Sequence, residues 1–550
     1  MRPNKSATVG PTPAPHASPP APATVPQSEI GSLINSASLP DLERPAFETY
    51  QQQVNKFYQQ GGYALAWLRD RRPSPQALAM VEEFKQAQLK GLTPDDYDAS
   101  RWDARLAKLG SVAPPPSDSD LVHFDLAFTI CAMRFISDLH VGRVNPQHFK
   151  FGLEVGTKQY DLAEVLRTRV LDAPDVAAAL AKVEPPYDGY RRAEAALPEY
   201  LKLAAQGDVA RIPAPERSIH PGQPYAAIPQ LVARLRQLGD LAASQGVSAG
   251  TGIYSGAVVD AVKHFQGRHG LAPDGVLGAG TVSELNKPLD YRLQQLDLAL
   301  ERYRWIPRHF PEPPIVVNIP EFRLRTLRRQ AAEFLSMNVV VGRAFRSQTP
   351  VFADEMRYVI FRPYWNVPTA IQRNELIPKI LRNPNYVAQH QYQIIDGGGS
   401  VVRDGAVDAD VMRGLRSGAY TIRQKPGAKN ALGLVKFIFP NDYNVYLHST
   451  PQPELFSRAR RDFSHGCIRV ENPAALAAWV LRNKPDWSSD RIRATMNGDS
   501  DNVQVNLDKP IPVLILYSTA VVEPDNEVHF FDDIYGYDAS LQKALQPGAS

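Results

Sequence analysis

Two short segments of the chain hold the residues best suited to chemistry. The segment VYLHST contains His448, and DFSHGCIRV contains His465, Gly466 and Cys467. A thiol with a pKa of about 8.5 is only slightly ionised at neutral pH, so a nucleophilic cysteine needs an imidazole or another positive group beside it. His448 lies nineteen positions before Cys467 and could meet it in space if a strand ends at one and the next segment begins at the other. These residues predict cysteine-based acyl transfer, with the N–H groups of Gly466 and Cys467 as an oxyanion hole.

A zinc site is the alternative chemistry for the same residues, because His448, His465 and Cys467 are all metal-compatible ligand types. A catalytic zinc ion needs three convergent ligands. Residues two apart share a face only on a regular strand, and Gly466 argues against a regular strand there. We therefore predict neither a metal nor a cofactor.

The second cysteine, Cys131, lies in the apolar stretch LVHFDLAFTICAMRFISDL, which is typical of a buried helix. A cysteine in such a helix usually packs as a small hydrophobic residue. Two cysteines allow no disulfide framework and no paired-cysteine zinc module.

Length and composition predict a multidomain protein. The 550 residues exceed what one core usually serves, and a net charge of +3 is too balanced for a nucleic-acid binder. No apolar run is long enough to span a bilayer. Residues 1–28 are rich in Pro and Ala, and this composition predicts a disordered tether. They show no signal-peptide pattern.

The pattern along the chain predicts a multidomain α+β protein. Residues 29–220 are mainly helical, with aromatic residues at helical spacing in PAFETYQQQVNKFYQQ. Residues 225–288 hold three short helical patterns, and 289–312 form a linker helix with leucines on one face and charges on the others. Residues 313–540 alternate apolar and polar residues and are predicted to be β-rich.

The module at 225–288 resembles the small three-helix peptidoglycan-binding module. The matching positions are Ala261, Val262, Phe265, Gln266, His269, Gly270, Leu271, Asp274, Gly275, Gly278 and Thr281. The resemblance implies wall binding. The alternative is a helical spacer in which Phe265 and Leu271 only pack a core, and both can hold together.

The segment SHGCIRV, with fifteen residues between His448 and Ser464, resembles the active-site signature of YkuD-type L,D-transpeptidases. Segments such as FRPYWNVP, LGLVKFIFPN and VYLHSTP resemble the large YcbB-like members, and FYQQGGYALAW and GRVNP resemble their scaffold domain. The resemblance implies a capping insertion at about 369–429. It also implies these site residues: nucleophile Cys467, base His448, orienting carbonyl Ser449, oxyanion donors Gly466 and Cys467, groove residues Tyr446 and Trp365, and Arg469 for loop order or a substrate carboxylate.

His465 is treated separately because some YcbB-like members lack a histidine at this position. The favoured interpretation is a ring that supports the loop through a hydrogen bond, and the alternative is direct tuning of the site's pKa values.

The resemblance further implies the reaction. A tetrapeptide stem would lose its terminal D-alanine to Cys467, and a second stem would then form a 3-3 cross-link. The same site could act as an L,D-carboxypeptidase, exchange other amines or anchor proteins, and a chiefly peptidoglycan-binding scaffold is an alternative of another class. Peptidoglycan stem peptides are the expected partners, other cell-wall synthesis proteins are possible ones, and periplasm or cell envelope is the expected location. Carbapenems are expected to acylate Cys467.

Overall fold

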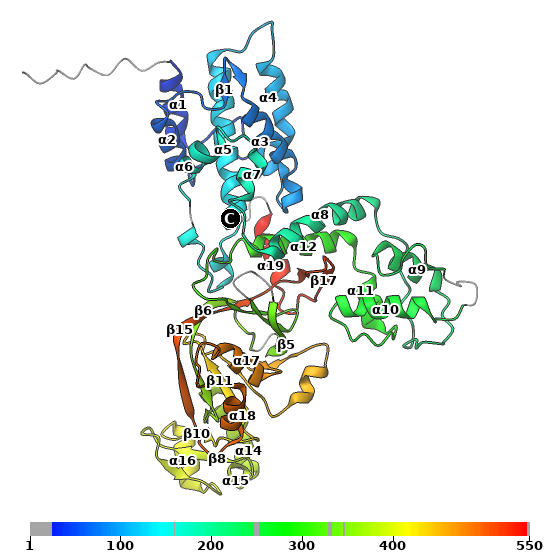
Figure 1. Cartoon of the computed structure of the whole chain (residues 1–550), viewed down its shortest axis with the longest axis vertical. Helices are drawn as coiled ribbons and strands as arrows, with labels where there is room; N and C mark the ends of the chain where they lie inside the picture. The colour runs from blue at the N-terminus through cyan, green and yellow to red at the C-terminus, as the bar shows by residue number, and fades with distance from the viewer. Residues whose placement is uncertain (1–24, 159, 247–251, 328–332, 345–346, 547–550) are drawn as a thin grey trace, which may run out of the picture. The chain divides into compact units, whose positions relative to one another are not determined.

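The computed structural model describes residues 25–158, 160–246, 252–327, 333–344 and 347–546 (Figure 1). Most of the predicted tether lies outside these residues. Its last residues already belong to helix α1 (Val25–Ser36), so the structured chain begins earlier than predicted. In the described ranges, no helix has the length and apolar character needed to cross a membrane.

The described chain divides into two compact units, and the first contains residues 25–85, 94–135 and 161–179. This unit is helical, as the sequence predicts. Its main helices are α1, α2 (Gln51–Gln60), α3 (Pro75–Lys85), α4 (Trp102–Leu109) and most of α5 (Asp118–Val141). Aromatic rings fill its core: the ring centroid of Phe128 lies 4.6 Å from that of Trp67 and 5.0 Å from that of Trp102. Cys131 is fully buried in α5, where burial raises the pKa of its thiol to about 12, so it packs as predicted.

The helix predicted over PAFETYQQQVNKFYQQ is shorter than expected. Phe47 is buried, but α2 begins only at Gln51. The N–H of Phe47 donates to the carbonyl of Ala37 at 2.9 Å, which commits this stretch to a turn instead of a helix. Val54, Phe57 and Tyr58 form the buried face of α2, as their spacing predicts.

In the second unit, the predicted module at 225–288 consists of three short helices. They are α9 (Ile228–Gln237), α10 (Ala257–Arg268) and α11 (Ala279–Leu285). Phe265 is fully buried between them. Gln266 has a structural task, because its side chain accepts from the N–H of Gly275 at 2.8 Å and donates to the carbonyl of Val276 at 3.1 Å. Gln266 and Gly275, from the FQ and DG positions of the motif, therefore stabilise the same turn.

The linker helix α12 (Leu289–Tyr303) differs from its predicted form. Its charged residues Arg292, Glu301 and Arg302 are buried, although the pattern predicts a solvated charged face. Partners inside the unit explain this: Arg292 pairs with Glu284 at 2.6 Å, and Arg302 pairs with Asp538 at 2.5 Å. The helix packs against α8 (Asp188–Gln206) and is a buried element of the core.

The catalytic half is built on a nine-stranded sheet with the order β13-β5-β14-β12-β11-β6-β15-β3-β4. A further pairing of β4 with β5 closes the sheet on itself. The strands are β3 (Ile315–Asn318), β4 (Arg323–Leu327), β5 (Glu333–Gly342), β6 (Phe352–Phe361), β11 (Val435–Ile438), β12 (Leu447–His448), β13 (Asp462–Ser464), β14 (Ile468–Val470) and β15 (Val503–Leu516).

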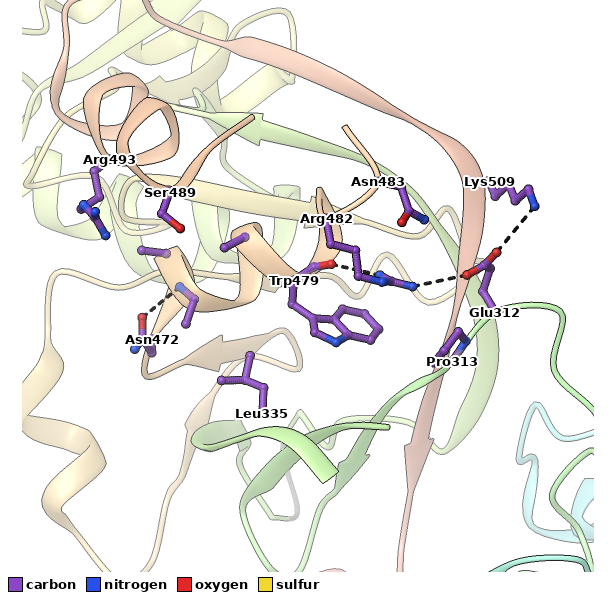
Figure 2. A pocket seen from close by; sticks show the side chains of 13 residues that line it. Glu312, Pro313, Leu335, Asn472, Trp479, Arg482, Asn483, Ser489, Arg493 and Lys509 are labelled. Carbon is purple, nitrogen blue, oxygen red and sulfur yellow. Dashed lines mark hydrogen bonds and ion pairs between the residues drawn. The ribbon is translucent and has the colours of Figure 1, made fainter. Parts of the chain in front are cut away.

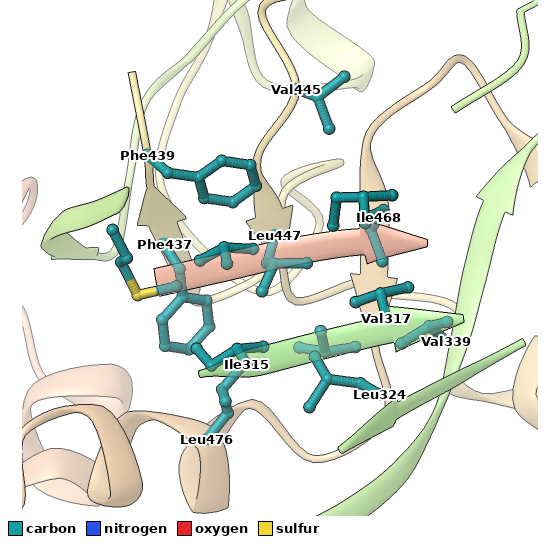
Figure 3. Close-up of a cluster of buried hydrophobic side chains, with 14 of the residues drawn as sticks. Ile315, Val317, Leu324, Val339, Phe437, Phe439, Val445, Leu447, Ile468 and Leu476 are labelled. Atoms are coloured by element: carbon teal, nitrogen blue, oxygen red, sulfur yellow. The ribbon is translucent and has the colours of Figure 1, made fainter. Parts of the chain in front are cut away.

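The interior of this sheet is a dense apolar core (Figure 3). Phe437, Leu447 and Ile468 from three neighbouring strands point into it with Val317, and Leu476 of α17 (Pro473–Val480) covers them. Because side chains alternate along a strand, the residues next to these in sequence face the opposite side. That opposite face carries the candidate site.

The expected capping insertion is a small subdomain with its own sheet, at the lower end of Figure 1. Its strand order is β7-β10-β8-β9, from β7 (Trp365–Asn366), β10 (Thr421–Gln424), β8 (Tyr392–Ile395) and β9 (Val401–Arg403). Its helical segments are α13 (Thr369–Ile371), η8 (Gln372–Leu376), α14 (Ile377–Arg382), α15 (Tyr386–Gln389) and α16 (Ala409–Ser417). A separate core that includes Ile380, Val387 and Ile422 lets this cap hold its own shape.

Candidate active site

Two parallel strands bring the predicted residues together. In the β12–β14 pair, Leu447 lies opposite Ile468, and His448 lies opposite Arg469. Continuing this register places Tyr446 beside Cys467, which directly precedes β14. Since Leu447 and Ile468 face the core, Tyr446, His448, Cys467 and Arg469 share the opposite face. The pairing thus brings the two segments side by side, with His448 beside Arg469 and Cys467 beside Tyr446.

His448 is held as a neutral, oriented imidazole. It is 5% exposed, and its Nδ1 lies 2.6 Å from the carbonyl oxygen of Ser449. A carbonyl only accepts, so Nδ1 carries the proton and Nε2 is left as the basic nitrogen. Burial lowers the pKa of His448 to about 3, with help from the charge of Arg469. The Ser449 carbonyl therefore stands where the family resemblance places the orienting group.

Cys467 is half-buried and is a thiol in this resting arrangement. Burial raises the pKa of its thiol, and hydrogen bonds from Tyr446 and the charge of Lys436 oppose that effect. Its Sγ lies 3.7 Å from the carbonyl oxygen of Asn444. The expected support from a positive imidazole is therefore absent from this state, because buried His448 is neutral.

The loop before Cys467 has a hydrogen-bond pattern that the sequence did not predict. The N–H of Gly466 donates to Oγ of Ser464 at 3.1 Å, and that hydroxyl donates to the carbonyl of Cys467 at 2.5 Å. Gly466 was expected to donate to an oxyanion, but its N–H is already occupied here. Its φ of 117° explains why a glycine stands at this position.

Buried Thr349 fixes the same loop from the other side. Its hydroxyl donates to the carbonyl of Gly466 at 2.7 Å and accepts from the N–H of Gly342 at 2.9 Å. Tyr535 completes the network by donating to the carbonyl of Gly342 at 2.6 Å. Nothing local in the sequence marks Thr349 or Tyr535, because their roles depend on contacts over more than a hundred residues.

His465 connects the nucleophile loop to the cap. Its Nε2 lies 2.6 Å from Oε1 of Glu375, which belongs to η8 of the cap. A supporting hydrogen bond was the favoured interpretation of this residue. The partner of His465 is not a residue of its own loop, because Glu375 belongs to the capping subdomain.

The predicted groove residues lie at Cys467. Trp365, on β7 of the cap, hydrogen-bonds Tyr446, and Tyr446 hydrogen-bonds Cys467. Burial raises the pKa of Tyr446, so its hydroxyl stays a donor. The guanidinium of Arg469 donates from Nη1 to Gln452 at 2.9 Å, while its buried Nε has no hydrogen-bond partner among the residues that the structure describes.

Two more residues belong to this site although their sequence context gave no signal. Lys436 of β11 lies opposite His448, and its Nζ is 3.9 Å from the ring centroid of Tyr446. Gly433 packs against Ser449, and an added Cβ there would lie 2.4 Å from Oγ of Ser449. Both contacts arise from strand pairing, which sequence spacing alone does not define.

A separate pocket of about 1020 Å³ lies beside α17 (Figure 2). Arg482 stacks over Trp479 there, 4.1 Å from the ring centroid, and pairs with Glu312 at 3.3 Å. None of the predicted site residues lines this pocket. Among the residues that the structure describes, no group of three or more His, Cys, Asp or Glu side chains could hold a metal ion.

A closed β-rich sheet carries a cysteine and an oriented histidine on one face. Three parts of the chain match known families. Residues 313–505 match the L,D-transpeptidase catalytic domain of the YkuD family, 52–197 match the scaffold domain, and 225–285 match the "Putative peptidoglycan binding domain". The chain therefore carries a YkuD-type L,D-transpeptidase catalytic domain, preceded by a scaffold domain and a peptidoglycan-binding domain in the order of the large YcbB-like members.

One curated relative extends the match. The chain is 34% identical over 251 residues to the "Putative L,D-transpeptidase" of Haemophilus influenzae. The aligned part is 46% of this chain, and it spans about half of the relative's length, 49%.

Proposed function

We propose that this protein is an L,D-transpeptidase that forms 3-3 cross-links between peptidoglycan stem peptides through an acyl-enzyme on Cys467. The observation that carries this proposal is the placement of Cys467, His448 and Tyr446 on one face of the β12–β14 pair. The matched catalytic and peptidoglycan-binding families support stem peptides as the substrate class.

In the acylation step, Nε2 of His448 accepts the proton of the Cys467 thiol, and Sγ attacks the carbonyl of the third stem residue. The carbon–nitrogen bond to the terminal D-alanine breaks, and the imidazolium returns the proton to the leaving amine. Because Sγ faces the Asn444 carbonyl at rest, the thiol must rotate toward His448 before it reacts. We expect the thiol to rotate when the donor stem peptide binds beneath the cap.

The developing oxyanion needs hydrogen-bond donors in a fixed place. The N–H of Cys467 is the first of these. The N–H of Gly466 becomes the second when Ser464 releases it, so Ser464 is expected to control the completeness of the oxyanion hole.

In the second step, the side-chain amine of another stem attacks the thioester. His448 takes a proton from that amine, and the thiol is regenerated as the amide forms. Trp365 and Tyr446 line the groove at Cys467, and Arg469 with its uncommitted Nε is suited to a substrate carboxylate. We infer action in the periplasm or cell envelope, where this polymer lies, and wall binding through residues 225–288.

The proposal is tested by incubating the purified protein and its Cys467→Ala variant with tetrapeptide muropeptides, followed by liquid chromatography and mass spectrometry. Cross-linked dimers that require Cys467 support a transpeptidase. Tripeptides with free D-alanine would instead establish an L,D-carboxypeptidase at the same site. Products that persist in Cys467→Ala would contradict the nucleophile assignment, and no turnover in the wild type would favour a binding scaffold.

A further inference from the structure

Lys436 occupies a position that core packing does not require. It lies on β11 between Val435 and Phe437, which are both fully buried in the core. Alternation therefore directs Lys436 to the other face, the one that carries Tyr446, His448 and Cys467. Its register partner across β11 and β12 is His448.

The ammonium group of Lys436 has no acidic partner there. Its Nζ lies 3.9 Å from the ring centroid of Tyr446, and within the described ranges no carboxylate forms an ion pair with it. Lys90, another largely buried lysine, is held differently: two carboxylates, Glu184 and Glu194, lie 2.7 and 2.9 Å from its Nζ. Burying an ammonium group without a carboxylate is costly, so the charge of Lys436 calls for another anion.

The thiol of Cys467 lies on the same face, can become an anion and interacts electrostatically with Lys436. Tyr446 joins the two, because its ring faces Lys436 and its hydroxyl hydrogen-bonds Cys467. We propose that Lys436 is a positioning residue of this site, whose ammonium group stabilises the thiolate of Cys467 directly and through the ring of Tyr446. This inference rests on the proposed function in taking Cys467 as the nucleophile.

The local electrostatics agree in direction. Burial raises the pKa of Cys467, and the charges of Lys436 and Arg469 oppose that rise. Burial lowers the pKa of Lys436, and the thiolate opposes that change, so ammonium and thiolate favour each other. Other charged or titratable groups surround the site. His448 lies on β12, Tyr446 directly precedes that strand, and Arg469 lies on β14. Arg343 and Glu454 lie beside Arg469, and the His465–Glu375 pair lies at the cap.

The test is alkylation of Cys467 by iodoacetamide, a neutral probe that needs no peptidoglycan substrate. Wild type, Lys436→Met and Lys436→Arg are followed by intact mass from about pH 6 to 10, with the adduct mapped to Cys467. We expect Lys436→Met to react about tenfold more slowly at neutral pH and to titrate at least about one pH unit higher. Lys436→Arg should restore most of the rate.

The matched control is Lys509→Met, which removes the same charge from an exposed lysine of the pocket beside α17. Its alkylation profile should equal that of the wild type. Lys436→Gln is the second variant, and thermal unfolding shows which variant keeps the fold. Equal rates and equal titration in the wild type and a folded Lys436 variant would overturn the inference, including the case in which Lys436 serves only a substrate carboxylate.

This readout also separates the inference from the proposed function. A shifted thiol titration with no turnover of muropeptides would support the role of Lys436 and reject the transpeptidase. Normal turnover with an unshifted titration would do the reverse.

Discussion

Neither His448 nor Cys467 is charged at rest, which sets this site apart from one with a standing thiolate and imidazolium. Burial is the common cause, since it lowers the pKa of His448 to about 3 and raises that of Cys467. A neutral Nε2 can accept the thiol proton at neutral pH. Ionisation is then delayed until the substrate arrives, which protects the thiol from side reactions.

The buried imidazole has a consequence for stability. An unfolded histidine has a pKa of about 6.5, whereas that of His448 is about 3. As pH falls below about 6.5, the unfolded state gains a proton that the folded state does not take up, so the free energy of unfolding decreases. The loss is about 2 kcal/mol at pH 5. We expect the melting temperature of His448→Gln to fall less than that of the wild type between pH 7 and 5, measured by calorimetry, and parallel curves would contradict this.

A side chain added at Gly433 is expected to change the position of His448. Its φ is 62°, and an added Cβ would lie 2.4 Å from Oγ of Ser449 and 2.7 Å from the N–H nitrogen of Thr450. Gly433→Ala should displace Ser449, whose carbonyl orients His448, and lower kcat by about tenfold or more with a stability loss of about 1–3 kcal/mol. Gly267→Ala is the matched control, since it lies in α10 with open space around it and should leave kcat unchanged. Unaltered kcat in Gly433→Ala would show that Ser449 does not position the base.

At the scale of elements, a hydrogen bond between Glu375 and His465 joins the cap to the nucleophile loop. Both side chains are more than a third exposed, so this contact is weak, worth about 0.2–1 kcal/mol. Trp365 makes a second contact between the cap and the site, through Tyr446. The cap otherwise has its own core and sheet.

Glu375→Gln should weaken the contact with His465. We expect alkylation of Cys467 by iodoacetamide to accelerate up to about fivefold, the limit for an exposed pair. Asp410→Asn removes a carboxylate of the same cap that pairs only locally with Arg413, so it serves as the control. Identical rates in both variants would mean that the ion pair does not restrict access.

Periodicity predicted the helical first part of this chain, the three short helices of 225–288 and the β-rich last part. It did not single out β15, the long strand Val503–Leu516 at the centre of the sheet. Pro510 and Pro512 interrupt its pattern, and prolines argue against a central strand. The structure accommodates them with a register shift between Asn506 and Ile511. Bulges of this kind depend on the partner strand, which the sequence does not reveal.

The candidate site divides in the same way. Cys467, His448 and Ser449 could be predicted because two short segments at a characteristic spacing carry them. Lys436 and Thr349 could not, because their contacts come from register and from hydrogen bonds between distant segments. The resting bond between Gly466 and Ser464 was also beyond prediction, since it reflects a loop conformation.

For the whole molecule, binding and chemistry are assigned to different domains. The peptidoglycan-binding match covers 225–285 and the catalytic match covers 313–505. We expect Cys467→Ala to sediment with purified sacculi as the wild type does while forming no cross-linked product. Loss of sedimentation in this variant would mean that wall binding depends on the acyl-enzyme instead of the module.

The most direct test of the central claim is the intact mass of the protein after brief exposure to a tetrapeptide donor, with peptide mapping of the adduct. We predict a gain equal to the donor minus D-alanine, located on the peptide that contains Cys467 and absent from Cys467→Ala. An adduct on another residue, or cross-linked product formed by Cys467→Ala, would contradict the acyl-enzyme at Cys467.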